Sequence, residues 1–264
     1  MDYYENFDAE QIPVYVTAVS FIGLGKTNLD FLKNQLRPLV KSKNMRELLN
    51  NSSDLKSMLL GLQIFKHCEV SIDTEKQSSC SDAYKVNIFV EEKKPQNLKA
   101  QWTVNTDGSM RVGGYYALNN IFRKGERLEV EGNIGRDSSK MRFATFTKPF
   151  ERNPNIKFSL GGSDCSYDHW WSKILRNESS IFAEIGALSR WGIQKLHWSS
   201  VWREIEASKS GANLKTNLRH SLEVDSRDDR ILPQSGLLLR LSEELSFLYP
   251  PPPRTAVGFE TAPP

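Results

Sequence analysis

The stretch LKTNLRHSLEVDSRDDRILPQSGLLLRLSEEL, residues 214–245, decides how most of this chain is expected to fold. Its first and last parts alternate apolar and polar residues, which is the period of a β-strand with one apolar face. Between them lie Asp, Arg, Pro and Gly, the residue types that turns favour. We therefore predict two neighbouring strands joined by a structural turn. The residues expected to shape that turn are Asp225, Arg227, Asp228, Pro233 and Gly236.

The same alternation recurs throughout the second half of the chain. The expected strands are residues 98–106, 110–118, 126–136, 139–148, 155–164, 178–188, 192–206, 212–224 and 236–246, with a long loop at 165–178. Segments of about 9–11 residues or more are long enough to cross a bilayer at a tilt. A transmembrane barrel turns the apolar face outward, whereas a soluble lipocalin-like barrel turns it inward. Alternation alone fits both.

The first part of the chain mixes strand and helix signals. Residues 14–23 alternate like a strand, and two helical stripes follow, one with Thr27 as its expected N-cap and one with Ser52 or Ser53. Two further strands are expected at Lys66–Asp73 and Ala83–Glu92. The order strand, helix, helix, strand, strand predicts a small sheet with two helices on one face.

Composition and motif spacing argue against several classes of function. The 35 Lys and Arg nearly balance the 32 Asp and Glu, which gives no support for nucleic-acid binding. Cys68, Cys80 and Cys165 lack metal-ligand spacing, so neither a metal nor a cofactor is expected. FIGLGKT resembles the end of a phosphate loop, but Ser20 stands where its first glycine belongs. With no catalytic motif found, an enzyme is the least favoured class.

Two sets of segments resemble known families. VSFIGLGKTNLDFL and LLGLQIFKHCEVSIDT resemble a polypeptide-transport-associated (POTRA) domain. DGSMRVGGYYALNNIFRKGERLEVEGNIG, HWSSVWREIE and residues 218–245 resemble the first strands of the barrel subunit of the mitochondrial sorting and assembly machinery (SAM), a relative of bacterial BamA. The resemblance implies an α+β POTRA domain (β-α-α-β-β) followed by an incomplete antiparallel transmembrane β-barrel of about nine strands. The expected divisions are a tail at 1–11, the POTRA domain at 12–95, the partial barrel at 96–247 and a Pro-rich tail at 248–264.

What the resemblance implies about function is strand templating without bond chemistry. Members of the family insert and assemble β-barrel precursors in the mitochondrial outer membrane, with the POTRA domain in the intermembrane space. The implied partners are barrel precursors, other SAM subunits and outer-membrane lipid, without nucleic acid. Carried over to this sequence, the precursor-binding candidates are Lys66, Cys68, Val70 and Ile72 on one strand and Leu98, Trp102 and Val104 on the first barrel strand.

The chain also departs from the family pattern. The family's barrel has sixteen strands, so we expect this chain to be a shortened product: a splice form, a gene-model error or a shortened paralogue. The alternative is a non-inserting form that acts only as a soluble POTRA-type polypeptide-binding module, because an open sheet leaves unpaired backbone groups in lipid. QSGLLLRL (Gln234–Leu241) also fits a loose targeting pattern of barrel precursors.

Overall fold

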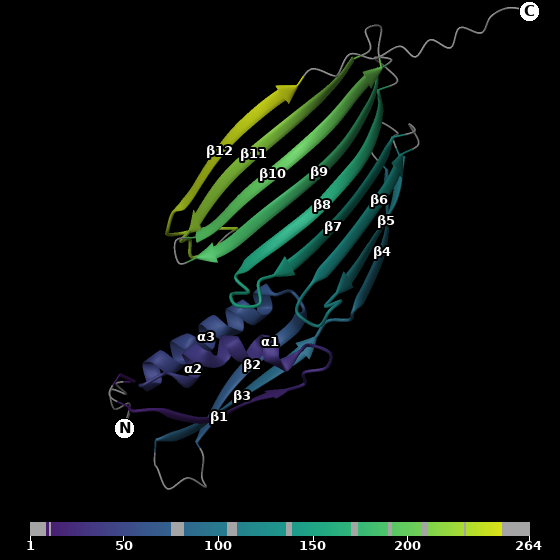
Figure 1. The fold of residues 1–264 in the computed structure, drawn as a ribbon. Helices are drawn as coiled ribbons and strands as arrows, with labels where there is room; N and C mark the ends of the chain where they lie inside the picture. Colours follow the sequence, from purple (N-terminus) through teal and green to yellow (C-terminus); the bar gives the residue numbers. More distant parts are fainter. Residues whose placement is uncertain are drawn as a thin grey trace, which may run out of the picture.

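The computed structural model contains a small α/β unit and a large curved sheet (Figure 1). It describes residues 9–10, 12–74, 82–104, 110–135, 139–169, 174–189, 192–206, 211–229 and 231–249. No helix in these ranges is both long and apolar enough to cross a membrane. The two sheets therefore define the architecture.

The N-terminal unit is a three-stranded sheet with helices on one face (Figure 1). Its strands, in the order β1-β3-β2, are β1 (Tyr15–Ile22), β3 (Ala83–Glu92) and β2 (Phe65–Thr74). Its helices are α1 (Leu29–Lys33), the 3-10 turn η1 (Asn34–Leu36), α2 (Arg37–Val40) and α3 (Met45–Gly61). The β1–β3 pair is parallel and the β2–β3 pair antiparallel. The element order is the expected one, except that the first helix is broken at η1.

Both expected N-caps were wrong, because an asparagine caps each helix. The Asn28 side chain accepts a hydrogen bond from the Asp30 amide at 2.8 Å, so α1 begins at Leu29, one residue later than a cap at Thr27 would place it. Asn44 caps α3 by accepting from the Glu47 amide at 2.8 Å. Ser52 lies inside α3 and donates to the Leu48 carbonyl at 2.7 Å. Either asparagine oxygen satisfies an amide that the first helical turn leaves unpaired.

The core of this unit lies between the helices and the sheet. Leu32, Leu48 and Leu59 on the helices are fully buried, at 0% exposure, and so are Val86 and Ile88 on β3. They belong to one continuous apolar cluster. The unit therefore has a hydrophobic core of its own.

The second half forms a nine-stranded sheet in which every neighbouring pair is antiparallel. The strand order is β12-β11-β10-β9-β8-β7-β6-β5-β4, so the chain moves to the adjacent position at each turn. The bounds are β4 (Gln96–Val104), β5 (Met110–Asn119), β6 (Arg127–Gly135), β7 (Lys140–Pro149), β8 (Ile156–His169), β9 (Ile174–Ser189), β10 (Gly192–Glu206), β11 (Gly211–Asp225) and β12 (Leu238–Tyr249). The prediction of nine antiparallel strands is confirmed.

Two boundaries differ from the prediction. The expected long loop at 165–178 was wrong, because β8 continues to His169 and β9 begins at Ile174. Their pairing runs unbroken from Cys165–Glu178 to His169–Ile174, so the backbone groups there are satisfied by the ladder. β12 begins at Leu238 and continues to Tyr249, past the expected end at 246. Polar side chains between Cys165 and Glu178 hid the strand period there.

Candidate functional site

The two faces of the large sheet have opposite character. On one face Ile181 and Ile185 are 58% and 44% exposed, and Leu160 is 51% exposed. On the other face, the side chain of Glu178 is only 16% exposed and that of Glu184 is 29% exposed. The polar face is therefore the more enclosed one, the reverse of a soluble barrel, which keeps its apolar face inside. This arrangement counts against the lipocalin-like alternative.

Ion pairs run across the strands on the enclosed polar face. Arg203 on β10 pairs with Glu178 on β9, and Arg176, two residues from Glu178 on the same strand, bonds that carboxylate at 2.8 Å. Nearer β12, Arg219 bonds Glu244 at 2.6 Å. Cross-strand pairs of opposite charge stabilise strand register. This face therefore has a fixed pattern of charges.

The strand β4 forms one edge of the sheet and carries the candidates Leu98, Trp102 and Val104. Among the described strands only β5 pairs with it. The three side chains are 77%, 83% and 63% exposed and lie on the apolar face. Behind the edge, the Gln101 amide donates to Asn133 Oδ1 on β6 at 3.0 Å, which ties β4 to the sheet. An edge of this kind offers unpaired backbone groups to another strand.

The other candidates lie on β2, an edge of the smaller sheet. Cys68 is 1% exposed, and Val70 and Ile72 pack against the same core. Lys66 is exposed and its Nζ bonds Glu91 at 3.0 Å. The apolar side chains of β2 therefore face the core, and strand addition at β2 would use its backbone edge. The β2 and β4 candidates belong to different sheets.

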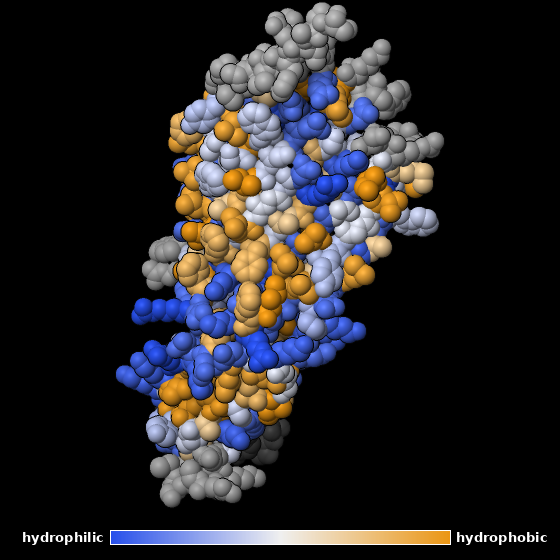
Figure 2. Space-filling view, turned by 45° about the vertical axis from the view of Figure 1, so that its right-hand side comes forward, coloured by the Kyte–Doolittle hydropathy of each residue, from blue (hydrophilic) through white to orange (hydrophobic). Residues whose placement is uncertain are grey.

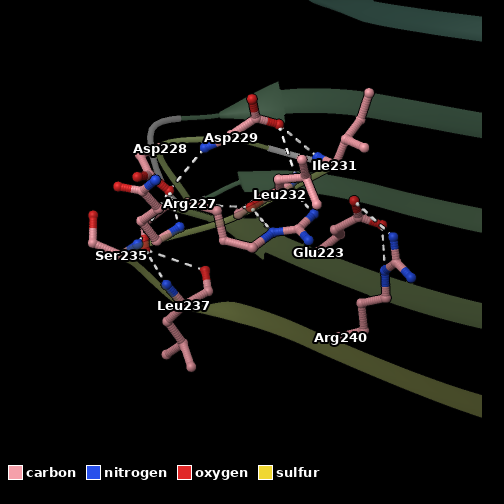
Figure 3. A network of polar contacts seen from close by, with 12 residues as sticks. Glu223, Arg227, Asp228, Asp229, Ile231, Leu232, Ser235, Leu237 and Arg240 are labelled. Atoms are coloured by element: carbon pink, nitrogen blue, oxygen red, sulfur yellow. Dashed lines mark hydrogen bonds and ion pairs between the residues drawn. The ribbon is translucent and has the colours of Figure 1, made fainter.

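The expected turn residues lie between β11 and β12 (Figure 3). Asp225 accepts from the backbone amide of Arg227 at 3.2 Å and pairs with its Nε at 2.8 Å. Oδ1 of Asp228 accepts from the amides of Asp229, Gln234 and Ser235 at 2.9, 3.1 and 3.2 Å. These hydrogen bonds hold the pKa of the Asp228 carboxyl below its ordinary value. The two carboxylates thus cap the backbone of a turn.

Two of those residues are placed by the backbone of the turn. Gly236 has φ +101°, and a Cβ there would lie 2.4 Å from the Ser226 carbonyl oxygen. Only glycine fits that conformation without strain. Pro233 lies in the same turn, where its missing amide hydrogen costs no ladder bond.

The phosphate-loop-like stretch holds a carboxylate of the protein itself. Oε1 of Glu92 accepts from the amides of Gly25 and Thr27 at 3.1 and 3.0 Å, and its Oε2 accepts from the Lys26 amide at 2.9 Å. Thr27 Oγ1 donates to Oε1 at 2.6 Å. Burial alone would raise the pKa of Glu92, but these hydrogen bonds outweigh it and lower the pKa. Glu92 thus occupies the nest that a phosphate would need.

Sequence reasoning missed Glu92 because its partner Thr27 lies 65 residues away. A carboxylate at the end of a strand gives no local signal of such a contact. Thr27 Oγ1 in turn accepts from the Asn120 side chain at 2.9 Å, and the Asn28 amide donates to the Arg123 carbonyl at 2.8 Å. The loop between β5 and β6 is therefore bonded to the N-terminal unit.

The described residues contain no group of three or more His, Cys, Asp or Glu side chains placed to hold a metal ion. Cys68 and Cys165 are both free and buried, and they belong to different sheets. Cys80 lies outside the residues that the structure describes.

The nine-stranded sheet has the fold of part of a BamA-like barrel, left open rather than closed. The structure is similar to BamA from Haemophilus ducreyi lacking POTRA domains 1–3, with a TM-score of 0.61 and 13% identity over 89% of this chain and 48% of that chain. It is also similar to CdiB from Acinetobacter baumannii, with a TM-score of 0.52 and 14% identity over 89% and 46% of the two chains. These likenesses show the fold.

By sequence, the chain is similar to proteins named sorting and assembly machinery component 50 homologues. The chain is 31% identical to homolog A of Xenopus laevis over 249 residues, which is 90% of this chain and 53% of that protein. It is 28% identical to the Homo sapiens homolog over 90% of this chain and 52% of that protein. The resemblance to the barrel subunit of the sorting and assembly machinery, stated from the sequence, is confirmed. The chain spans about half the length of these relatives, and no family model matches it.

Proposed function

We propose that this chain belongs to the machinery that inserts and assembles β-barrel precursors in the mitochondrial outer membrane. Residues 12–95 act as a POTRA domain in the intermembrane space, and residues 96–247 supply the first strands of the barrel. The observation that carries the proposal is the exposed edge of β4, at the end of a sheet whose apolar face is the open one.

Strand pairing accounts for the activity without bond chemistry. A backbone group left unpaired in hydrocarbon costs several kcal/mol, far more than the roughly 1 kcal/mol that one hydrogen bond contributes in water. An incoming precursor strand that pairs with β4 satisfies its own backbone and that of the edge together. Strand addition of this kind obtains its affinity from main-chain hydrogen bonds. No catalytic side chain is required.

Each side of the sheet has a role in this mechanism. Leu98, Trp102 and Val104 face the lipid and place the edge at the depth where pairing is favoured. The charged face, with pairs such as Arg219–Glu244, faces the barrel interior. Precursors, other SAM subunits and outer-membrane lipid are the partners. A soluble POTRA-type module is not favoured, because the similarity to the relatives spans 90% of the chain and so includes the sheet.

Cysteine cross-linking in isolated mitochondria tests this proposal. Trp102→Cys lies on the edge, and Ile134→Cys lies in the same cross-strand row two strands further in, through Val112. Both are made with Cys80→Ser and incubated with a radiolabelled precursor that carries one cysteine in its last strand. We expect disulfide adducts at position 102 and none at 134. Equal adducts at both positions, or none at either, would contradict pairing at β4.

Alkaline carbonate washing tests the location separately. An integrated chain stays in the pellet because its apolar face lies in lipid. Recovery in the supernatant would rule out the membrane-inserted form.

A further inference from the structure

A recess of about 460 Å³ opens where β7 ends and β8 begins, on the side of the sheet nearest the N-terminal unit. It is lined by Lys148, Pro149, Phe150, Glu151, Arg152 and Phe158. Lys148 and Phe158 are cross-strand partners, and the adjacent pair on the same face is Phe146–Leu160. The recess therefore continues the apolar face of the sheet at the end nearest the N-terminal unit.

Two cations beside the recess, Lys148 and Arg152, form no direct ion pair with an acidic side chain that the structure describes, although the charge of Lys148 also acts on Glu151. Glu151, the acidic residue of the lining, bonds Lys124 at 2.7 Å. That hydrogen bond and the charge of Lys124 hold the pKa of Glu151 below its ordinary value, so it stays ionised and paired. Lys148 and Arg152 are exposed, and neither forms an ion pair with any residue that the structure describes. Two positive charges therefore remain available at the mouth of the recess.

The loop that carries Phe150 and Arg152 is held in place by both units. The Phe150 amide donates to the Ile156 carbonyl at 2.9 Å, which closes the connection between the strands. The Gln35 side chain from the N-terminal unit donates to the Glu151 carbonyl at 3.2 Å. Figure 2 shows hydrophilic residues gathered where the sheet meets that unit, below an apolar zone on the sheet. The recess is thus formed before any ligand arrives and lies at an interface between polar and apolar surface.

We propose that this recess binds an anionic phospholipid, with its phosphate between Lys148 and Arg152 and its acyl chains along Phe158 and Leu160. The inference rests on the proposed location in the outer membrane. A basic residue beside an apolar surface keeps its charge in water while its stem covers the apolar part. Phe150, 48% exposed, and Leu160, 51% exposed, supply an apolar wall that free phosphate would not use. This is why a lipid, rather than a soluble anion, is the occupant.

The test titrates the full chain in detergent micelles with phosphatidylglycerol and with phosphatidylcholine, and counts bound lipid by native mass spectrometry. The variant Lys148→Gln/Arg152→Gln removes both cations. The matched control Lys140→Gln/Arg142→Gln removes the same charge from the same face of β7 at its other end. A third variant, Phe150→Ser, alters the apolar wall without changing charge. Thermal unfolding of each variant confirms that it is folded.

We expect the wild-type chain to prefer phosphatidylglycerol over phosphatidylcholine. Each cation near a phosphate contributes about fivefold, so Lys148→Gln/Arg152→Gln should lose roughly 25-fold in affinity for phosphatidylglycerol. The control should lose less than about twofold in affinity for phosphatidylglycerol. Phe150→Ser should weaken the binding of both lipids to the same extent. No preference in the wild type, or an equal loss in the control, would overturn the proposal. Displacement by inorganic phosphate with no lipid preference would show an anion site only and would also overturn it.

These outcomes are separable from those of the proposed function. Binding is read in micelles, whereas insertion is read by carbonate washing of mitochondria. A chain that inserts and shows no lipid preference overturns the lipid site alone. A chain that prefers phosphatidylglycerol in micelles but washes out of mitochondria overturns the location.

Discussion

Substituting Glu92 should loosen the loop at residues 25–27, which in turn contacts the loop between β5 and β6. The Glu92 carboxylate accepts three backbone amides and one hydroxyl, at distances from 2.6 to 3.1 Å. A hydrogen bond to a charged group contributes roughly 1.5–3 kcal/mol when it is well shielded from water. Because part of this site is exposed to solvent, we reduce the total for Glu92→Ala to about 3 kcal/mol. That loss should fall on residues 25–27 and on the Asn120 contact that depends on Thr27.

Hydrogen exchange of the full chain measures this loss directly. About 3 kcal/mol corresponds to exchange roughly 100-fold faster at the amides of residues 25–27 in Glu92→Ala. The neighbouring control Glu91→Ala removes one exposed ion pair with Lys66 and should change the same rates by less than about fivefold. Exchange in Glu92→Ala within threefold of the wild type would refute the reasoning. It would mean that water replaces the carboxylate at no cost.

The same contact should make stability depend on pH in a defined direction. The pKa of folded Glu92 is below its ordinary value. Its contribution is therefore complete above the unfolded pKa, about 4.3, and is lost as the pH falls through the folded pKa. In urea titrations, the difference between wild type and Glu92→Gln should be constant at neutral pH and shrink below about pH 4. A difference that grows on acidification would contradict this sign.

Two further predictions concern the turn between β11 and β12. Asp228→Ala removes the acceptor of three turn amides and should lower the midpoint of urea unfolding. Substitution of the exposed Glu243 by Ala should leave that midpoint unchanged. Equal midpoints of the two variants would show that the turn amides bond water equally well. Gly236→Ala should lower the free energy of unfolding by about 1–3 kcal/mol, because φ is +101° and the new Cβ would meet the Ser226 carbonyl. Gly211→Ala, with nothing within 4 Å of its Cβ, serves as the control in the same unfolding assay. Equal stabilities of the two variants would contradict the strain at Gly236.

The sequence predicted the strands because their signal is local. Alternation along β6, β11 and β12 is carried by neighbouring residues, and nine such segments imply a meander once their turns are short. The break between β8 and β9 was misjudged because residues such as Ser166 and Asp168 in the segment 165–178 are typical of loops. Cross-strand pairing keeps them in the ladder, and pairing depends on a partner strand that the period of one segment does not reveal.

The start of helix α1 likewise depends on a contact that the local sequence does not reveal. Thr27 and Asn28 are both residue types found at N-caps, and intrinsic preference favours asparagine over threonine only slightly. In the structure the Thr27 hydroxyl forms hydrogen bonds with Glu92 and Asn120, and Asn28 caps α1 instead. The contact of Thr27 with Glu92 on β3 therefore determines which residue caps α1.

By itself, the sequence determined the two-part organisation, the antiparallel strands and the resemblance to the SAM barrel subunit. Only the tertiary structure decided which face of the sheet is enclosed, because the curved sheet covers the face that carries Glu178 and Glu184 and leaves Ile181 on the open face. It alone showed that the Gly25–Thr27 nest holds Glu92. It also brought Lys148, Arg152 and Phe158 around one recess. The curvature of a sheet and a contact between Thr27 and Glu92, 65 residues apart, are not encoded in the residue pattern of one segment.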